Sequence, residues 1–165
     1  MRVTLEAATP DAAAEIARLR NEVADRLTRR HGLGHWSNLS TENGIRSTMQ
    51  RSRVYVAWHD GRIVATLTLQ TKKPWAIDRR YFADVRRPLY LLSMAVAADL
   101  HRQGIGRQCL AAARAIAREW PADAIFLDAY DAEAGAGEFY RKCGFEEVGR
   151  ASYRGTPLIY YQMLL

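Results

Sequence analysis

The residues best suited to chemistry in this sequence form a glycine-containing turn, His101-Arg102-Gln103-Gly104-Ile105-Gly106-Arg107, between an apolar segment and an amphipathic one. Glycine lets the backbone curl and come close to a ligand. A helix that starts here would present unpaired N–H groups and the positive end of its dipole. Such a helix start suits a pyrophosphate, and Arg102 and Arg107 would add positive charge beside it.

Two better-known phosphate motifs are absent from this turn. It lacks the GxxxxGK[ST] pattern of the nucleotide P-loop and the GxGxxG pattern of dinucleotide-binding folds. Taken by itself, the turn also fits an ordinary tight connection between a strand and a helix. Elsewhere, His31 and His35 stand four residues apart, but the glycines between them argue against a helix that would align them on a metal, so we expect no metal site.

Apolar periodicity predicts the elements that hold the turn. Residues 89–96 are almost continuously apolar, which is typical of a central strand that is buried on both faces. A helix is expected after the turn, with Pro121 ending it. Its predicted buried face consists of Ile105, Cys109, Ala112, Ile116 and Trp120.

The rest of the chain predicts a mixed α/β domain. Before residue 89 we expect a strand at 3–7, a helix from the N-cap Thr9 to Gly32, a short helix after Ser40 or Thr41, and a hairpin that turns at Asp60-Gly61. A long irregular stretch from Lys72 to Pro88 follows the hairpin. Beyond the turn we expect strands at 125–127, 145–150 and 158–164, and a helix at 132–143 with Gly144 at its C′ position.

A second motif makes the pattern specific. Phe139-Tyr140-Arg141-Lys142-Cys143-Gly144-Phe145 holds a Tyr-x-x-x-Gly-Phe pattern, with Ala136 one helical turn before the tyrosine. The turn itself follows Met94-Ala95-Val96 and has the form His101-x-x-Gly104-x-Gly106. Together these motifs resemble the GNAT N-acetyltransferase superfamily, whose turn is [RQ]-x-x-G-x-[GA]. This chain departs from the family at two places, His101 for the usual Arg or Gln and Glu133 for a frequent Asn.

The resemblance implies an acetyl-CoA-dependent N-acetyltransferase that transfers an acetyl group to a primary amine by direct attack in a ternary complex. It implies a single GNAT domain over residues 1–165, with a mixed, mostly antiparallel sheet of about seven strands flanked by about four helices. The pantetheine arm of acetyl-CoA would pair with backbone groups of Met94, Ala95 and Val96 where the fourth and fifth strands diverge. Tyr140 would protonate the leaving thiolate as general acid. The turn from His101 to Arg107, together with Ala136 and Phe139, would complete the cofactor site.

The proton acceptor for the amine stays open at this level, and so does a water relay. The polar candidates near the expected cleft are Ser93, Asp84, Asp128, Tyr130, Asp131 and Glu133. The acceptor should be set by the loops from Arg29 to Thr41 and from Lys72 to Pro88. Their aromatic residues Trp36, Trp75, Tyr81 and Phe82 could line a pocket or join the core.

Charge and composition limit the kinds of partner and the location expected for this protein. The 165 residues carry a formal net charge of +6, but no run exceeds two consecutive arginines, so we expect no nucleic acid as partner. The resemblance implies a small-molecule or peptide amine as substrate. There is no signal peptide and no apolar run long enough for a membrane span, which predicts a cytoplasmic protein without membrane contact. Cys109 and Cys143 are expected to be buried and inert. The sequence leaves open a homodimer, a longer acyl group, a hydroxyl acceptor, a CoA-sensing module without turnover and a toxin that acetylates aminoacyl-tRNA.

Overall fold

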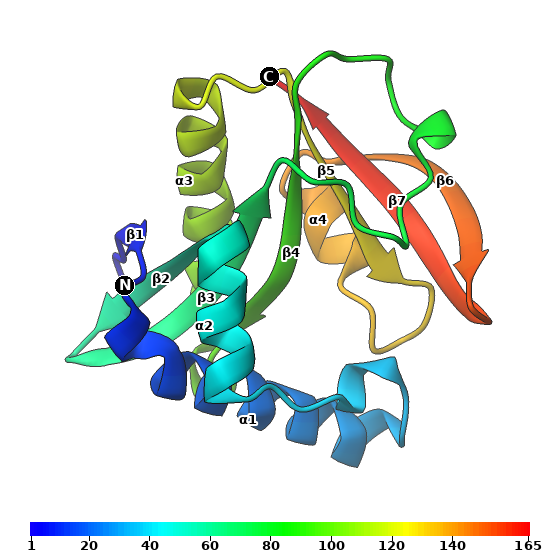
Figure 1. The fold of residues 1–165 in the computed structure, drawn as a ribbon. Helices are drawn as coiled ribbons and strands as arrows, with labels where there is room; N and C mark the ends of the chain where they lie inside the picture. The colour runs from blue at the N-terminus through cyan, green and yellow to red at the C-terminus, as the bar shows by residue number, and fades with distance from the viewer. The chain divides into compact units, whose positions relative to one another are not determined.

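The computed structural model describes the whole chain, residues 1–165, as two compact units. The first unit comprises residues 1–70 and 92–113, and the second comprises residues 71–91 and 114–165. Strand β4 (Pro88–Val96) and helix α3 (Ile105–Glu119) contribute residues to both. Seven strands follow the order β1-β2-β3-β4-β5-β7-β6, and with four α-helices they confirm the predicted mixed α/β fold (Figure 1). A single functional domain over residues 1–165 stays a prediction.

The first unit joins an antiparallel meander to two helices. Its strands and helices are β1 (Leu5–Ala7), α1 (Ala13–His31), α2 (Glu42–Arg51), β2 (Arg53–His59) and β3 (Arg62–Gln70), followed by the C-terminal half of β4. Strands β2 and β3 meet at Asp60 and Gly61, which both have positive φ values of 48° and 73°, as the predicted tight hairpin turn requires. Helix α1 packs against α2 and β3, and Ile16 and Leu19 of α1 and Ile45 of α2 are buried.

The ends of the first two helices test the capping predictions. Helix α2 begins as predicted, with the Thr41 hydroxyl accepting a hydrogen bond from the Gly44 backbone N–H at 3.0 Å. The prediction that Thr9 caps the first helix is wrong, because its side chain makes no capping hydrogen bond. A 3-10 helix, Pro10–Ala12, comes first and leads directly into α1. Pro10 therefore starts a 3-10 helix, and this short helix takes the place of a side-chain cap at the start of α1.

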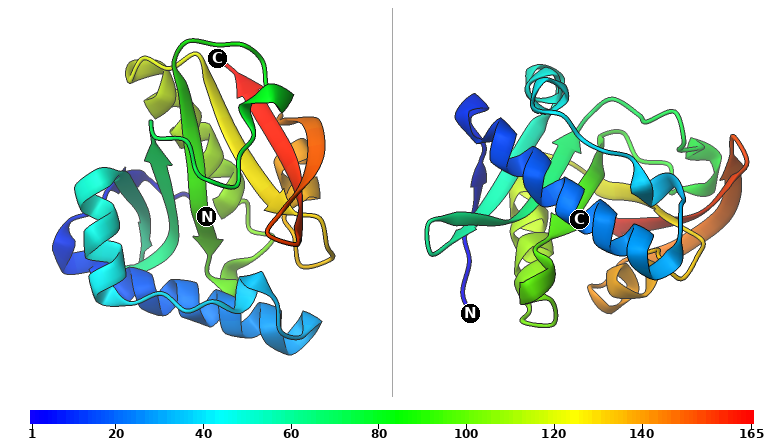
Figure 2. Two further views of the ribbon diagram at one scale, coloured as in Figure 1. Left: turned by 45° about the vertical axis from the view of Figure 1, so that its right-hand side comes forward. Right: turned by 90° about the horizontal axis from the view of Figure 1, so that it is seen from below.

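The second unit is built on β5 and β7. It holds the N-terminal half of β4, then β5 (Ala124–Tyr130), α4 (Gly137–Lys142), β6 (Glu146–Tyr153) and β7 (Thr156–Leu164). Strand β5 is parallel to β4 and antiparallel to β7, and β6 forms the edge. The irregular segment of residues 71–87 crosses one face of β5 and β7 (Figure 2). Phe82 fixes it there, because its ring stacks on Phe126 at a centroid distance of 4.4 Å and lies 5.2 Å from Tyr160.

Two helix predictions need correction. The helix expected over residues 132–143 covers only Gly137–Lys142. A Cβ atom on Gly135 would lie 1.9 Å from the Tyr130 carbonyl oxygen, so the chain folds tightly back on the end of β5 before the helix starts. In α3 the fully buried face includes Ala113 and Ala117, whereas Ala112 and Ile116 are half-buried. The small alanines gave too weak an apolar signal to position that face.

No helix of the chain combines the length and the apolar character needed to cross a bilayer.

Candidate functional site

The turn predicted to bind phosphate has the backbone of an anion site. After β4 a 3-10 helix, Ala98–Leu100, leads into the turn, and α3 starts at Ile105. Gly104 has a positive φ of 79°, which curls the chain as the sequence predicts, and Arg102 has a positive φ of 65° that the sequence did not predict. The Gln108 N–H donates to the Gly104 carbonyl at 3.1 Å as the first helical bond. The N–H groups of the preceding helical residues therefore have no acceptor within the helix.

Contacts within the first unit hold this turn in place. The Ala97 N–H donates to the Val64 carbonyl at 2.8 Å, and Arg26 Nη1 donates to the Ala98 carbonyl at 3.2 Å. Ile105 is buried, whereas the residues from His101 to Gly104 are exposed. The helix start is thus anchored on its core side and open on its solvent side.

The His101 side chain has a partner that the sequence did not predict. Its Nε2 atom donates to the Val96 carbonyl at 3.0 Å, because a carbonyl oxygen can only accept. The imidazole therefore ties the turn to the end of β4. Arg102, Gln103 and Arg107 are exposed around the turn, and a Cβ atom on Gly104 would meet no atom within 4 Å. This open surface, with main-chain donors and positive charge, fits the pyrophosphate of acetyl-CoA.

Strand β4 contains an irregularity that the sequence did not indicate. Ser93 has a φ of 54° in the middle of the strand, and its side chain is exposed. The expectation of a strand buried on both faces is therefore correct only for its first half, where Leu89, Tyr90 and Leu91 are buried. Serine has no preference for positive φ, so no sequence signal could have placed this distortion. The backbone of Met94, Ala95 and Val96 follows it directly, and its pairing with the pantetheine arm stays a prediction.

Tyr140 lies on the short helix α4 of the second unit. Gly144 ends this helix with a φ of 95°, and its N–H donates to the Arg141 carbonyl while the Phe145 N–H donates to the Tyr140 carbonyl. These two bonds form the Schellman arrangement that the Gly144 prediction requires. The Tyr140 ring is buried against Phe145 and Tyr161 at centroid distances of 5.7 and 6.2 Å.

The two other residues predicted on this helix flank the tyrosine. Ala136 is the N-cap residue of α4, and the Phe139 ring lies 5.5 Å from that of Tyr140. Gly137 permits a close approach on this side, because a Cβ atom there would lie 2.3 Å from the Tyr161 hydroxyl. Their contact with a cofactor stays a prediction.

Burial controls the ionisation of the groups around Tyr140. It raises the pKa of the Tyr140 phenol, and the negative charges of Asp128 and Cys143 raise that pKa further. The phenol therefore keeps its proton throughout the neutral range. Burial also raises the pKa of Asp128 on β5. Asp128 pairs with Tyr160 across β5 and β7, so their side chains lie on the same face.

The structure separates the other candidates for proton acceptor. Asp131 forms an ion pair with Arg150 at 3.4 Å, and Asp84 and Glu133 are exposed. Burial raises the pKa of the Tyr130 phenol, so it keeps its proton. Ser93 is the one candidate that belongs to the first unit. Asp128 is the carboxylate whose charge acts on Tyr140.

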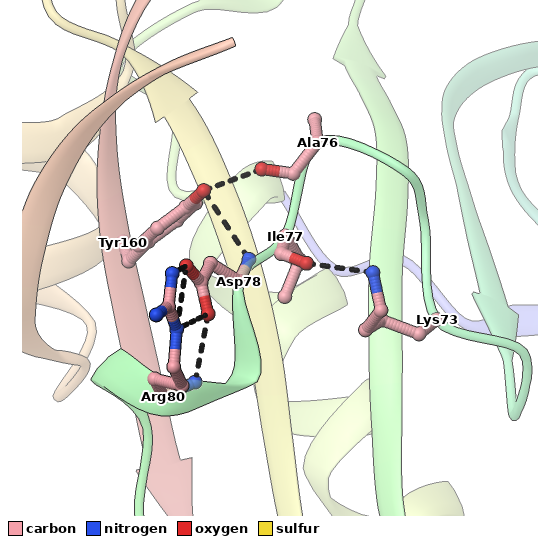
Figure 3. Close-up of polar contacts among 6 residues, drawn as sticks. All are labelled: Lys73, Ala76, Ile77, Asp78, Arg80 and Tyr160. Carbon is pink, nitrogen blue, oxygen red and sulfur yellow. Dashed lines mark hydrogen bonds and ion pairs between the residues drawn. The ribbon is translucent and has the colours of Figure 1, made fainter.

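The segment Thr71–Arg87 holds functional candidates that the sequence pattern missed. Tyr160 Oη donates to the Ala76 carbonyl and accepts from the Asp78 N–H at 3.3 Å. Figure 3 shows these hydrogen bonds, together with Lys73 Nζ donating to the Ile77 carbonyl at 2.7 Å. It also shows the Arg80 guanidinium donating two hydrogen bonds to the Asp78 carboxylate. The segment is thus held by its own polar side chains and by β7. The sequence indicated its length and its aromatic residues Trp75, Tyr81 and Phe82, but not the polar contacts of Lys73, Asp78 and Tyr160.

The predicted site residues therefore form two groups. Residues 94–107 come together in the first unit, and Ala136, Phe139 and Tyr140 come together with Asp128 in the second.

Comparison with known proteins shows to which family the chain belongs. The model of the acetyltransferase (GNAT) family matches residues 16–145, and the chain belongs to this family. The family uses acetyl-CoA as co-substrate for acetyl transfer. No curated protein sequence matches the chain.

Solved structures agree with the fold. A ribosomal-protein-alanine N-acetyltransferase from Brucella melitensis is 22% identical, with 98% of this chain and 99% of that chain covered and a TM-score of 0.74. A GNAT-family acetyltransferase from Streptococcus agalactiae is 16% identical, with 99% and 95% covered and a TM-score of 0.75. The yncA protein of Salmonella typhimurium, solved with its cofactor acetyl-CoA, is 17% identical, with 99% and 94% covered and a TM-score of 0.71.

Proposed function

We propose that this protein transfers the acetyl group of acetyl-CoA to a primary amine by direct attack of the amine on the thioester. The observation that carries the proposal is the protonated, buried phenol of Tyr140 beside the charge of Asp128. The helix start at Gly104 supports the choice of co-substrate, since its free N–H groups and exposed arginines suit a pyrophosphate.

In this proposal Tyr140 acts as the general acid. When the amine nitrogen bonds to the thioester carbon and the carbon–sulfur bond breaks, the phenol proton goes to the departing sulfur. Burial keeps that proton in place beforehand, because it raises the pKa of Tyr140. The Schellman end of α4 and the packing on Phe145 fix the ring.

Asp128 is our choice for the proton acceptor. The amine attacks in its neutral form. The Asp128 carboxylate receives the proton that the nitrogen loses on attack, while Tyr140 supplies a proton to sulfur, and return of the Asp128 proton to the Tyr140 phenolate restores both groups without a net proton from solvent. Burial raises the pKa of Asp128 toward the working range of a base. The other carboxylates are paired or exposed.

The test is turnover of acetyl-CoA with a panel of amines, amino acids and peptides, with free CoA thiol as the readout. The expected result is thiol release that depends on an amine, with an N-acetylated product in the mass spectrum. Acetyl-CoA binding by calorimetry without turnover on any amine would contradict the proposal and favour a CoA-binding module. A product acetylated on oxygen would contradict the choice of acceptor.

A further inference from the structure

A pocket of about 500 Å³ lies in the second unit between the segment Thr71–Arg87 and the hairpin of β6 and β7. Small-molecule sites commonly have this size. The residues that matter for its chemistry are Lys73, Trp75, Asp78, Arg79, Tyr153 and Tyr160.

The charges of the pocket do not balance. Lys73 Nζ donates to two neutral carbonyls, those of Pro74 at 3.0 Å and Ile77 at 2.7 Å, which leaves one of its three donors for a ligand. Arg79 also has neutral partners, the Val85 carbonyl at 3.1 Å, the Tyr90 hydroxyl at 3.4 Å and the Phe126 ring. Its Nε atom is buried without a hydrogen-bond partner.

The one carboxylate of the pocket is already satisfied. Arg80 binds Asp78 with two of its nitrogens, at 3.0 Å from Nε to Oδ1 and 2.7 Å from Nη2 to Oδ2, and the Arg80 N–H adds a third bond (Figure 3). The Asp78 carboxylate is therefore neutralised by a residue outside the pocket lining. Lys73 also acts on Asp78, but with Arg79 and Arg80 it gives this region more positive than negative charge, which favours a ligand with an anionic group.

The walls of the pocket favour an apolar, planar group. The Trp75 side chain is 82% exposed although its backbone belongs to a segment held by Lys73 and Tyr160. An indole that is held at a pocket mouth and left uncovered is a typical anchor for a ligand. Tyr153 adds a second, half-buried ring from β6.

The pocket is connected to the proposed chemistry through Asp128. Tyr160 lines the pocket and pairs with Asp128 across the strands, on the same face of the sheet. The charge of Asp128 acts on the phenols of both Tyr160 and Tyr140. A ligand in the pocket would therefore have its amine on the sheet face that carries Asp128, whose charge also acts on Tyr140.

We propose that this pocket binds the acceptor, and that the acceptor is an amine carrying both a carboxylate and an aromatic or bulky apolar group. This inference rests on the proposed function. The carboxylate binds the ammonium of Lys73 and the guanidinium of Arg79, and the apolar group lies against Trp75 and Tyr153.

The experiment compares L-phenylalanine with phenethylamine, which lacks the carboxylate, as acceptors for the wild type, Lys73→Met and Trp75→Ala. The wild type should have a KM at least tenfold lower for L-phenylalanine. Lys73→Met should raise that KM about tenfold, the loss of one charged hydrogen bond, and leave the KM for phenethylamine within about twofold. Trp75→Ala should raise both KM values. Lys72→Met removes the same charge next to the pocket lining and should change neither.

Three outcomes would overturn the proposal. A wild type that uses both amines equally well has no carboxylate site. Equal effects of Lys73→Met on both amines would show that the lysine only holds its loop. Calorimetric binding of L-phenylalanine without acetyl-CoA separates the pocket from the reaction. Binding that depends on Lys73 supports the pocket even where no acetyl transfer occurs, and absence of binding together with turnover of other amines places the acceptor elsewhere.

Discussion

The turn before α3 and the surroundings of Tyr140 differ in the material from which they are made. The turn offers main-chain N–H groups on an exposed surface, and its His101 side chain holds it to the Val96 carbonyl. Around Tyr140 the functional groups are side chains, the buried Tyr140 and the half-buried Asp128, whose ionisation depends on their surroundings. A backbone site should tolerate side-chain changes that leave its shape and charge alone, whereas a side-chain site should fail with the loss of one hydroxyl.

The largest effect is expected at Tyr140. Tyr140→Phe should lower kcat by about 10²-fold, at the lower end of general-acid contributions, with little change in acetyl-CoA affinity. Tyr161→Phe is the matched control, because it removes a neighbouring buried phenol and keeps its ring against Tyr140. Steady-state kinetics and calorimetry measure both. An equal loss in the two variants would assign Tyr140 to packing.

A smaller loss is expected in the turn when its charge and backbone change. Gly104→Asp should weaken acetyl-CoA binding roughly 30-fold, or about 2 kcal/mol, because the carboxylate faces the phosphate site and the position has a φ of 79°. Gly104→Asn keeps the shape, tolerates positive φ and lacks the charge, so it should cost only about fivefold. Similar affinities for the two variants would mean that no phosphate lies near residue 104.

These two regions also differ in how far they can be predicted from the sequence. The turn is contiguous, and Gly104 and the helix start after it have local signatures that the structure confirms. Near Tyr140, only the helix end at Gly144 has such a signature. Asp128 was one of six polar candidates, because its burial depends on strands that are distant in sequence. The pocket joins Lys73 and Trp75 to Tyr153 and Tyr160, about 80 residues later. No periodicity links such residues, so only the folded chain brings them together.

Stability against pH should reveal the burial of Asp128. An unfolded aspartate titrates near pH 3.9, and burial raises the pKa of Asp128 in the folded state, so the folded state binds the proton more tightly. Stability therefore falls as pH rises from the unfolded pKa through the folded one. Asp128→Asn should be more stable than the wild type at pH 8, and the difference should vanish below about pH 4. Denaturant unfolding measures it, with the exposed Asp84→Asn as control. A constant difference at every pH would contradict a raised pKa.

The smallest effect is expected at His101, and it is the sharpest test of a backbone-built site. His101→Ala removes the hydrogen bond from Nε2 to the Val96 carbonyl but none of the main-chain donors of the turn. Acetyl-CoA affinity, measured by calorimetry, should fall about two- to threefold and stay within the tenfold that corresponds to 1.4 kcal/mol. His101→Gln supplies an amide donor for the same carbonyl and should restore the wild-type affinity. A loss well beyond tenfold that glutamine does not restore would show that the imidazole itself binds the phosphate, and the turn would then depend on side chains as the surroundings of Tyr140 do.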